Sequence, residues 1–359
     1  MKTNRGLFFI LALGFAASAV AAEPSFSVKS WQKELSVSLE NGDRNISKLL
    51  DISITERKVF TTEKDTERKS LLTARELFAK DKFPQALALY DQVSKSSDEW
   101  LEVTEEKGWA FHRQNDFEKA LAQTKTLLSQ PLIQIVGSEP FFLQSLTQLK
   151  ICDYAGVLAT HQLFKDTQRE RVQRIQELAQ DGTSPAFVKV IEKADEFPMS
   201  FVDVGQEAKD LPRLFFRDLE LQKSLLETKM SSVGVALIKE KMGIRPSSQK
   251  SQLTKSLATL EKTEVKSRAR LKRRIIELAS IENGQNKKIL QKLNLVEIET
   301  IERMHTDQDL DRKSFHQGEY AQTTDQDLIF PDDGKPWMDE LDRYQVKANT
   351  CPQNIRRKM

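Results

Sequence analysis

Four histidines and two cysteines are the side chains of this sequence best suited to acid–base, metal or thiol chemistry. They are His112, His161, His305 and His316, with Cys152 and Cys351. None of the histidines has a second His or Cys at a spacing typical of a metal site. Cys152 and His161 are near neighbours in sequence, but a thiol nucleophile also needs a third group that orients its histidine.

Recognised catalytic motifs are also missing. The sequence contains no G-x-S-x-G, H-E-x-x-H, phosphate-binding loop, dinucleotide fingerprint or C-x-x-C. Adjacent carboxylates occur at Asp332-Asp333 and Asp339-Glu340, but they indicate little in a chain of which 30% is charged. We therefore expect a protein that is not an enzyme and that binds neither a cofactor nor a metal.

The two cysteines allow two interpretations. An exported chain can form a disulfide, and a bond between Cys152 and Cys351 would tie the C-terminal tail to the middle of the chain. Alternatively, Cys152 is a buried small apolar residue between apolar neighbours, and Cys351 is a tail thiol. We favour the second interpretation, because spacing alone does not bring two sulfur atoms together.

The first residues predict export. Lys2 and Arg5 precede an apolar run over 7–17, and Ala19-Val20-Ala21 supplies the small residues read by a signal peptidase. The apolar run is shorter than the roughly 20 residues that span a bilayer. We expect cleavage after Ala21 or Ala22, a periplasmic location, and no transmembrane segment in the mature chain.

Composition predicts a helical protein without affinity for nucleic acid. Basic residues number 55 and acidic residues 53, and the signal peptide removes two bases and no acid, so the mature chain is neutral. Gly and Pro are scarce, at 13 and 11 residues. Leu, Lys, Glu, Gln and Ala dominate, and these residues favour helices. The expected fold class is all-α.

Two segments of the chain repeat the same residue types 34 residues apart. Phe83 and Ala86 in the first correspond to Phe117 and Ala120 in the second. An internal period of this length predicts a repeat architecture in which each segment is one structural unit.

The pattern resembles the tetratricopeptide repeat family, in which helical hairpins stack at this period. Gly108 matches a small residue of that family, and a degenerate third unit has its turn at Asp153-Tyr154. A helix after Phe164 is expected to cap the array. The resemblance implies a concave groove for an extended peptide or a partner helix. The expected contacts on the first helices are Thr73, Leu77, Lys107, Phe111 and Gln114. The expected structural residues are Phe83, Ala86, Gly108, Phe117, Ala120 and Tyr154.

Behind the repeats, helical periodicity predicts two long helices over 249–281 and 287–304, broken at Asn283-Gly284 and packed as an antiparallel hairpin. The first carries a basic stripe formed by Lys262, Lys266, Arg270, Arg273 and Arg274. The stripe fits a solvated face, or a surface that docks on anionic lipid, cell-wall polymer or an acidic partner. Val265 and Ala269 are expected on the opposite, apolar side.

The C-terminal tail combines acids with apolar and aromatic residues over 325–345. Apolar residues would be superfluous in a purely solvated tail. We therefore expect this segment to fold back onto the helices, with its acids near the basic stripe. The alternative is a tail that anchors to another protein.

These observations predict an envelope scaffold or adaptor whose repeats hold a protein partner. The signal peptide, the repeats and residues 330–337 are similar to exported repeat proteins of predatory and gliding bacteria, some of which belong to envelope motility complexes. The alternative is a structural protein that binds cell-wall polymer or anionic lipid through the basic helix. The predicted organisation is a signal peptide (1–22), a leader (23–66), repeats with a capping helix (67–182), a helical region (183–246), a charged hairpin (247–306) and a tail (307–359).

Overall fold

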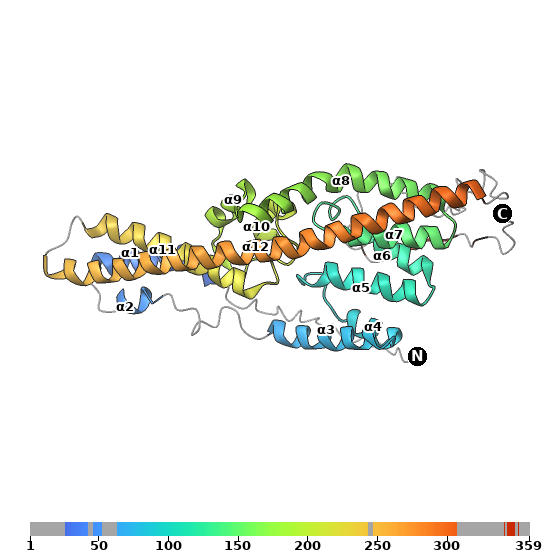
Figure 1. Ribbon diagram of the computed structural model, residues 1–359. Helices are drawn as coiled ribbons and strands as arrows, with labels where there is room; N and C mark the ends of the chain where they lie inside the picture. Colours follow the sequence, from blue (N-terminus) through green and yellow to red (C-terminus); the bar gives the residue numbers. More distant parts are fainter. Residues whose placement is uncertain are drawn as a thin grey trace, which may run out of the picture.

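The computed structural model describes residues 26–41, 46–51, 63–242, 247–306, 341, 343–348 and 351. The predicted signal peptide and nearly all of the acidic tail lie outside these residues. Within them the structure is almost entirely helical, which confirms the all-α prediction (Figure 1). No helix of this part is both long and apolar enough to cross a membrane.

The elements run in the following order. The first half contains β1 (Phe26–Ser27), α1 (Val28–Asn41), α2 (Ile46–Leu49), α3 (Glu63–Ala79), α4 (Phe83–Tyr90), α5 (Trp100–Arg113), α6 (Phe117–Leu127) and α7 (Glu139–Lys150). The second half contains α8 (Tyr154–Asp181), α9 (Pro185–Lys193), β2 (Glu196–Phe197), α10 (Phe201–Val204), the 3-10 helix η3 (Gly205–Asp210), α11 (Leu219–Met242) and α12 (Ser247–Thr306). β1 and β2 form a short antiparallel pair.

Helix α12 is the spine of the molecule. Its 60 residues extend for about 90 Å at the helical rise of 1.5 Å per residue (Figure 1). One half packs against α11, and the other packs against α7 and α8. Buried residues follow one stripe at spacings of three and four along most of its length. They include Leu253, Leu260, Ser267, Leu271, Ile275, Leu278, Glu282, Asn286, Ile289, Leu293, Val296 and Thr300.

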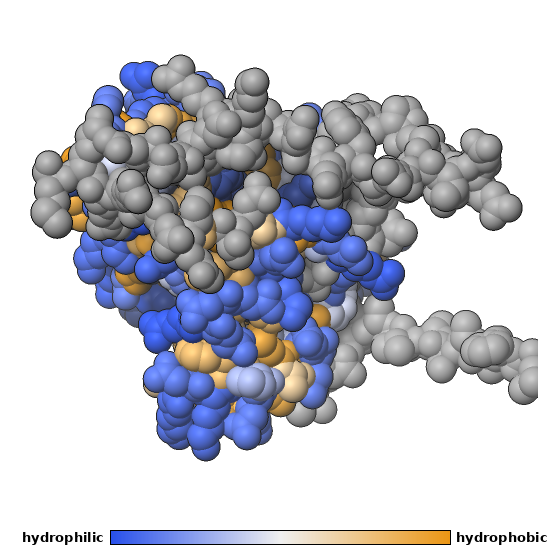
Figure 2. Space-filling view, turned by 90° about the vertical axis from the view of Figure 1, so that its right-hand side faces the viewer, coloured by the Kyte–Doolittle hydropathy of each residue, from blue (hydrophilic) through white to orange (hydrophobic). Residues whose placement is uncertain are grey.

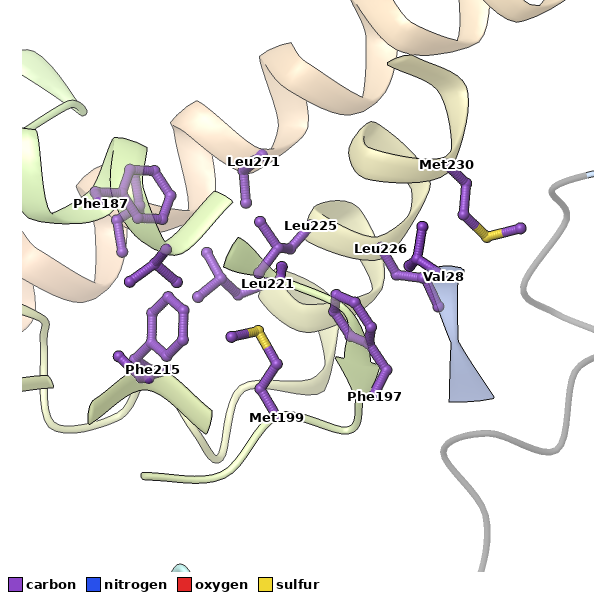
Figure 3. Close-up of a cluster of buried hydrophobic side chains, with 14 of the residues drawn as sticks. Val28, Phe187, Phe197, Met199, Phe215, Leu221, Leu225, Leu226, Met230 and Leu271 are labelled. Atoms are coloured by element: carbon purple, nitrogen blue, oxygen red, sulfur yellow. The ribbon is translucent and has the colours of Figure 1, made fainter. Parts of the chain in front are cut away.

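A large hydrophobic core joins distant parts of the chain (Figure 3). Val28 of α1 lies beside Leu226 and Met230 of α11, while Phe187 of α9 and Leu271 of α12 approach from the other side. The residues predicted as a leader therefore contribute to the same core as α9, α11 and α12. Helix α1 buries Trp31, Leu35 and Leu39 at helical spacing, so burial stabilises this segment as a helix.

Three helical hairpins follow one another in the chain: α3–α4, α5–α6 and α7–α8. Each turn contains one non-glycine residue at positive φ, namely Asp81 (58°), Asn115 (60°) and Cys152 (62°). In each turn the following N–H donates to the carbonyl five residues earlier, for example Asp116 to Phe111. This is the Schellman pattern, which ends a helix with a left-handed residue. The third hairpin has the same turn, and α8 continues without a break through the segment predicted as a separate cap.

The cysteines form a disulfide between the third turn and the C-terminal segment. Our preference for separate thiols was therefore wrong. The left-handed turn places Cys152 at the corner between α7 and α8, and the C-terminal segment passes this corner. Sequence spacing could not show that approach, because 199 residues separate the two cysteines.

The predicted hairpin over 247–306 was also wrong. Asn283 and Gly284 lie inside α12, with the helix continuous on both sides. Buried residues on either side, Glu282 and Asn286, belong to one packed stripe, and this packing outweighs the roughly 1 kcal/mol that glycine costs within a helix. The antiparallel partner of the first half of α12 is α11.

Replacing Gly284 by alanine tests the continuity of α12. A Cβ at Gly284 meets no atom within 4 Å, so Gly284→Ala should raise the free energy of unfolding by about 1 kcal/mol through helix propensity. At Gly108 a Cβ would lie 2.8 Å from Cδ2 of buried Leu143, and overpacking costs about 1–3 kcal/mol. Gly108→Ala is therefore the matched control that should not stabilise. Urea unfolding measures both, and a destabilised Gly284→Ala variant would contradict a continuous helix.

Candidate functional site

The five predicted groove residues do not line one surface. Lys107 is buried and its Nζ lies 2.9 Å from the Asp91 carboxylate at the end of α4. Leu77 packs into the core of the first hairpin, and the Phe111 ring lies 5.4 Å from Lys119 Nζ of α6. Thr73 and Gln114 are exposed and donate to carbonyls of their own helices. Leu77, Lys107 and Phe111 thus face the second helices of the hairpins, and partner binding by the five stays a prediction.

Most of the predicted structural residues are buried. Phe83, Ala86, Ala120 and Tyr154 are buried, and Gly108 packs closely against Leu143 of α7. Phe117 is half-buried and its ring lies 5.6 Å from that of His112. A view of the repeat end of the molecule shows a mostly hydrophilic surface, with apolar side chains gathered low in the picture at the height of α3 and α4 (Figure 2).

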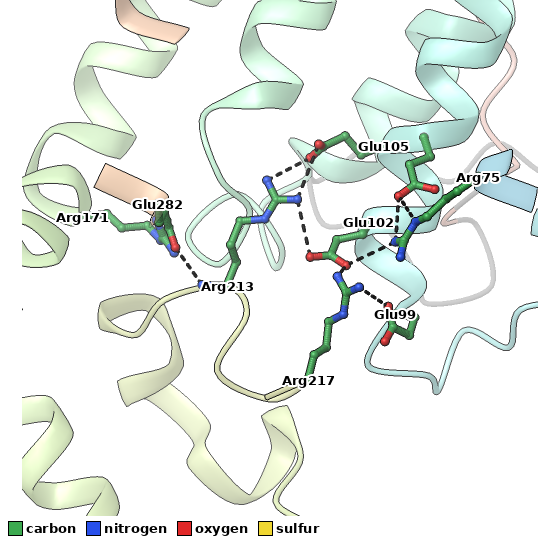
Figure 4. Close-up of polar contacts among 9 residues, drawn as sticks. Arg75, Glu99, Glu102, Glu105, Arg171, Arg213, Arg217 and Glu282 are labelled. Atoms are coloured by element: carbon green, nitrogen blue, oxygen red, sulfur yellow. Dashed lines mark hydrogen bonds and ion pairs between the residues drawn. The ribbon is translucent and has the colours of Figure 1, made fainter. Parts of the chain in front are cut away.

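The inner face of the first two hairpins carries charged residues of opposite sign. Helix α3 contributes Arg68 and Arg75, and α5 contributes glutamates at 99, 102, 105 and 106, on or just before its first two turns. Opposite them runs the segment 211–218, which contributes Arg213 and Arg217 (Figure 4). The spacing of these glutamates on one side of a predicted helix was a signal for this face that our sequence analysis did not use.

These side chains form one ionic network. Arg217 pairs with Glu99 at 2.7 Å and with Glu102, and Arg213 pairs with Glu105 at 3.3 Å (Figure 4). Arg75 joins from α3, with 2.8 Å to Glu106. Arg68 donates to the Arg217 carbonyl at 3.1 Å. These ion pairs and hydrogen bonds hold segment 211–218 against α3 and α5.

A buried ion pair between α8 and α12, with its hydrogen bonds, holds segment 211–218 against α12. Arg171 of α8 pairs with Glu282 of α12, and both side chains are 4% exposed. The second Glu282 oxygen accepts the Arg213 backbone N–H at 2.8 Å, and Arg171 also donates to the Leu211 carbonyl at 3.1 Å. Buried charges are costly unless they are paired and hydrogen-bonded. This arrangement therefore favours one relative placement of α8, α12 and segment 211–218.

Burial changes the acid–base properties of this region. It raises the pKa of Glu105, against the opposing effect of Arg213. It lowers the pKa of the Arg217 guanidinium, which Glu99 counteracts. The Arg213 pKa is raised, mainly by Glu105. Arginines retain their charge at any ordinary pH, so they remain the fixed cations of the network.

Farther along, the second half of α12 packs against the third hairpin. The Trp109 ring of α5 lies near Phe142 of α7, with ring centroids 5.8 Å apart, and Lys292 of α12 lies 5.0 Å from the Phe142 ring. Glu297 of α12 accepts from His161 of α8 at 3.3 Å. Both α7 and α8 thus contact α12.

A cleft remains between α3, segment 214–218 and α12. Its volume is about 320 Å³. Arginines at both walls (Arg68, Arg75, Arg217 and Arg274) surround apolar residues (Leu71, Leu72, Leu214, Leu278 and Ile281), and the acids Glu99 and Asp218 complete the lining. Leu72 is 59% exposed and Ile281 43% exposed, so apolar side chains of both α3 and α12 are accessible at the cleft.

The basic stripe of α12 divides into two parts. Arg270 pairs with Glu227 of α11, and Arg274 pairs with Asp218 and, at 2.7 Å, with Glu277. Lys262, Lys266 and Arg273 are exposed. The predicted approach of the tail acids to the stripe lies outside the described residues, whereas acids of the helical body bind Arg270 and Arg274. Val265 is 70% exposed rather than on the packed side, since the buried stripe runs through Leu260, Ser267 and Leu271. Ala269 is exposed as well.

The part of the chain that the structure describes holds no group of three or more His, Cys, Asp or Glu residues arranged to bind a metal. Comparison of the whole sequence and fold with protein-family models, curated proteins and solved structures finds no match. The three hairpins are thus established by their geometry, and membership of the tetratricopeptide repeat family stays a prediction.

The buried ion pair should show strong coupling. Arg171→Met leaves the Glu282 carboxylate buried without its cation and should cost about 3–5 kcal/mol of unfolding free energy. Combining it with Glu282→Leu removes both charges and should cost less than Arg171→Met alone. Arg303→Met, which removes an exposed pair with Glu299 on the same helix, should cost less than about 1 kcal/mol. Additive costs in urea unfolding would contradict the proposed coupling.

His112 should make the repeats sensitive to acid. Its Nδ1 lies 2.9 Å from the Thr147 hydroxyl of α7. Burial lowers the His112 pKa below its ordinary value of 6.5, and Lys150 and Arg113 lower it further. Because the unfolded chain takes up the proton more readily, stability should fall as pH drops below about 6.5.

His112→Gln retains a hydrogen-bonding group without this titration. The loss of unfolding free energy between pH 7.5 and pH 5 should therefore be smaller in the variant, as measured by urea unfolding at both pH values. Some loss should persist, since the pKa of His161 is also lowered by burial. An unchanged pH dependence would exclude His112 as a contributor.

Proposed function

We propose that the protein is an interaction scaffold of the cell envelope, exported by its N-terminal signal peptide, that holds a segment of a partner protein in the cleft between α3 and α12. The observation that carries this proposal is the cleft itself, with accessible Leu72 and Ile281 on opposite sides.

The lining defines the kind of segment that would bind. The arginines of the lining are already paired with acids of the protein or bonded to a carbonyl, so the accessible apolar residues decide the preference, and they favour a ligand that presents aliphatic or aromatic side chains. A short amphipathic peptide or helix presents such side chains on one face. The ionic network below the cleft keeps the arginines in place, which reduces the entropy lost on binding.

Site-specific photo-cross-linking in intact cells tests the proposal. A photoreactive phenylalanine at Leu72 and another at Ile281, on facing walls, should cross-link the same protein, which mass spectrometry identifies. Val188 of α9 is 42% exposed and carries the control probe, because it lies away from the cleft. Leu72→Glu should weaken the cross-link from Ile281. Identical products from the Val188 probe, or none from either cleft position, would reject the proposal.

Among the five predicted groove residues, Lys107 is not a suitable position for testing partner binding by a charge reversal such as Lys107→Glu. Lys107 pairs with Asp91 inside the first two hairpins, so reversing its charge should place two acids together and destabilise the repeats. A loss of binding in that variant would report folding rather than contact. Leu72 is preferable because its side chain is exposed.

A second candidate function is binding of anionic lipid or cell-wall polymer by the outer face of α12. Lys262, Lys266 and Arg273 are exposed there, and the neighbouring Glu261 and Glu264 are engaged by Lys239 and Arg268. The triple variant with glutamate at these three positions should lose salt-sensitive sedimentation with anionic vesicles or cell wall. If the wild-type protein does not sediment at low salt, this second function is excluded.

A further inference from the structure

The last described residues of the chain lie along the outer side of the repeats. The Leu341 carbonyl accepts from Lys95 Nζ in the connection between α4 and α5. Tyr344 lies 4.8 Å from Lys125 Nζ of α6, measured to the ring centroid, and the Ala348 N–H donates to Glu118 Oε1 at 3.1 Å. Cys351 is bonded to Cys152 at the turn between α7 and α8.

These contacts define an extended segment antiparallel to α6. The four residue steps from Tyr344 to Ala348 run beside the seven residue steps of α6 from Lys125 back to Glu118. An extended chain advances about 3.3 Å per residue and a helix 1.5 Å, so the two lengths agree at roughly 10–13 Å. The segment therefore follows the helix rather than crossing it.

Burial alternates along the segment. Tyr344, Val346 and Ala348 are half-buried, whereas Arg343, Gln345 and Lys347 are exposed. Leu341 is 1% exposed. Period-two burial is the property of a strand with one face against a surface. The surface of α6 and the preceding connection thus selects apolar side chains at alternate positions of an extended peptide.

We propose that this outer surface of α6 is a docking site for an extended peptide of another protein, and that the chain's own Leu341 and residues 343–348 occupy it while the Cys152–Cys351 disulfide is closed. The partner peptide presents apolar or aromatic side chains at alternate positions, with an aromatic residue at Lys125. This site is on the opposite side of the hairpins from the α3–α12 cleft and does not depend on the function proposed for that cleft.

The disulfide controls access to the site. A dithiol reductant supplies two electrons and two protons, the S–S bond breaks to leave two thiols, and the dithiol becomes its own disulfide. Cys351 is half-exposed, so its sulfur is within reach of such a thiol, whereas Cys152 is buried. After reduction the segment is held by its non-covalent contacts alone, and a partner peptide can compete for α6.

Fluorescence anisotropy with a labelled peptide tests the proposal. The probe is residues 341–351 with serine at the position of Cys351. The receiving protein is the full chain with Cys152→Ser and Cys351→Ser and with Tyr344→Asp, Val346→Asp and Ala348→Asp, so that its own segment cannot occupy α6. Saturable binding is expected to this variant, and none to the oxidised wild-type protein.

Two controls define the specificity. A peptide with Tyr344 exchanged with Arg343, and Val346 with Lys347, keeps the composition but reverses the alternation, and it should not bind. Lys125→Ala in the receiving protein should weaken binding about two- to fivefold, the range for an exposed cation–π contact. Equal binding of the exchanged peptide, or of the probe to oxidised wild type, would overturn the proposal, as would absence of binding to a variant with wild-type circular dichroism.

A measurement in the wild-type protein covers the case in which that variant does not fold. A photoreactive phenylalanine at Tyr344 should cross-link to residues 117–127 of α6 in the oxidised protein. Adding dithiothreitol together with excess unlabelled 341–351 peptide should reduce this product at least twofold, whereas the exchanged peptide should not. Cross-links outside α6 and its neighbouring connection, or a product that the peptide does not reduce, would overturn the proposal.

Discussion

The buried pair between Arg171 and Glu282 is the constraint on which the arrangement of this molecule depends. Its two charges lie near the middle of α12, where solvent cannot screen them, so each requires the other and the hydrogen bonds around it. The Glu282 carboxylate also holds the Arg213 backbone. One contact therefore sets how α8, the spine and segment 211–218 meet, and the network toward α5 and α3 extends from that point.

The length of α12 explains how one helix completes two separate hydrophobic cores. A straight helix of about 90 Å is longer than a single compact core, so α12 serves two packing partners in succession. Near its start it completes the core formed with α1, α9 and α11, and near its end it completes a second core with α7 and α8. The ion pair separates these regions, and polar residues of the buried stripe such as Asn286, which accepts from Ser138 at 2.8 Å, fix the register between them.

Both sides of the helical hairpins are partly occupied by the chain's own segments. Segment 211–218 pairs with α5, the second half of α12 packs on α7 and α8, and the C-terminal segment follows α6. Stacked hairpins expose side chains on both sides, and the chain pairs many of its charged residues internally. The α3–α12 cleft, which combines arginine with leucine side chains, therefore stays accessible, whereas the outer surface of α6 is covered by the C-terminal segment.

The features determined by the sequence alone are local ones. Helical composition, the tight turn of each hairpin and the helical periodicity of 249–281 and 287–304 all depend on residues within a few positions of one another. Tertiary structure alone decided that Gly284 continues a helix, that Cys351 reaches Cys152, and that Arg270 and Arg274 bind acids of the body. The inward direction of Lys107 was decided in the same way. Each of these outcomes is set by partners far away in the sequence, because burial and ion pairing, rather than propensity, supply the deciding free energy.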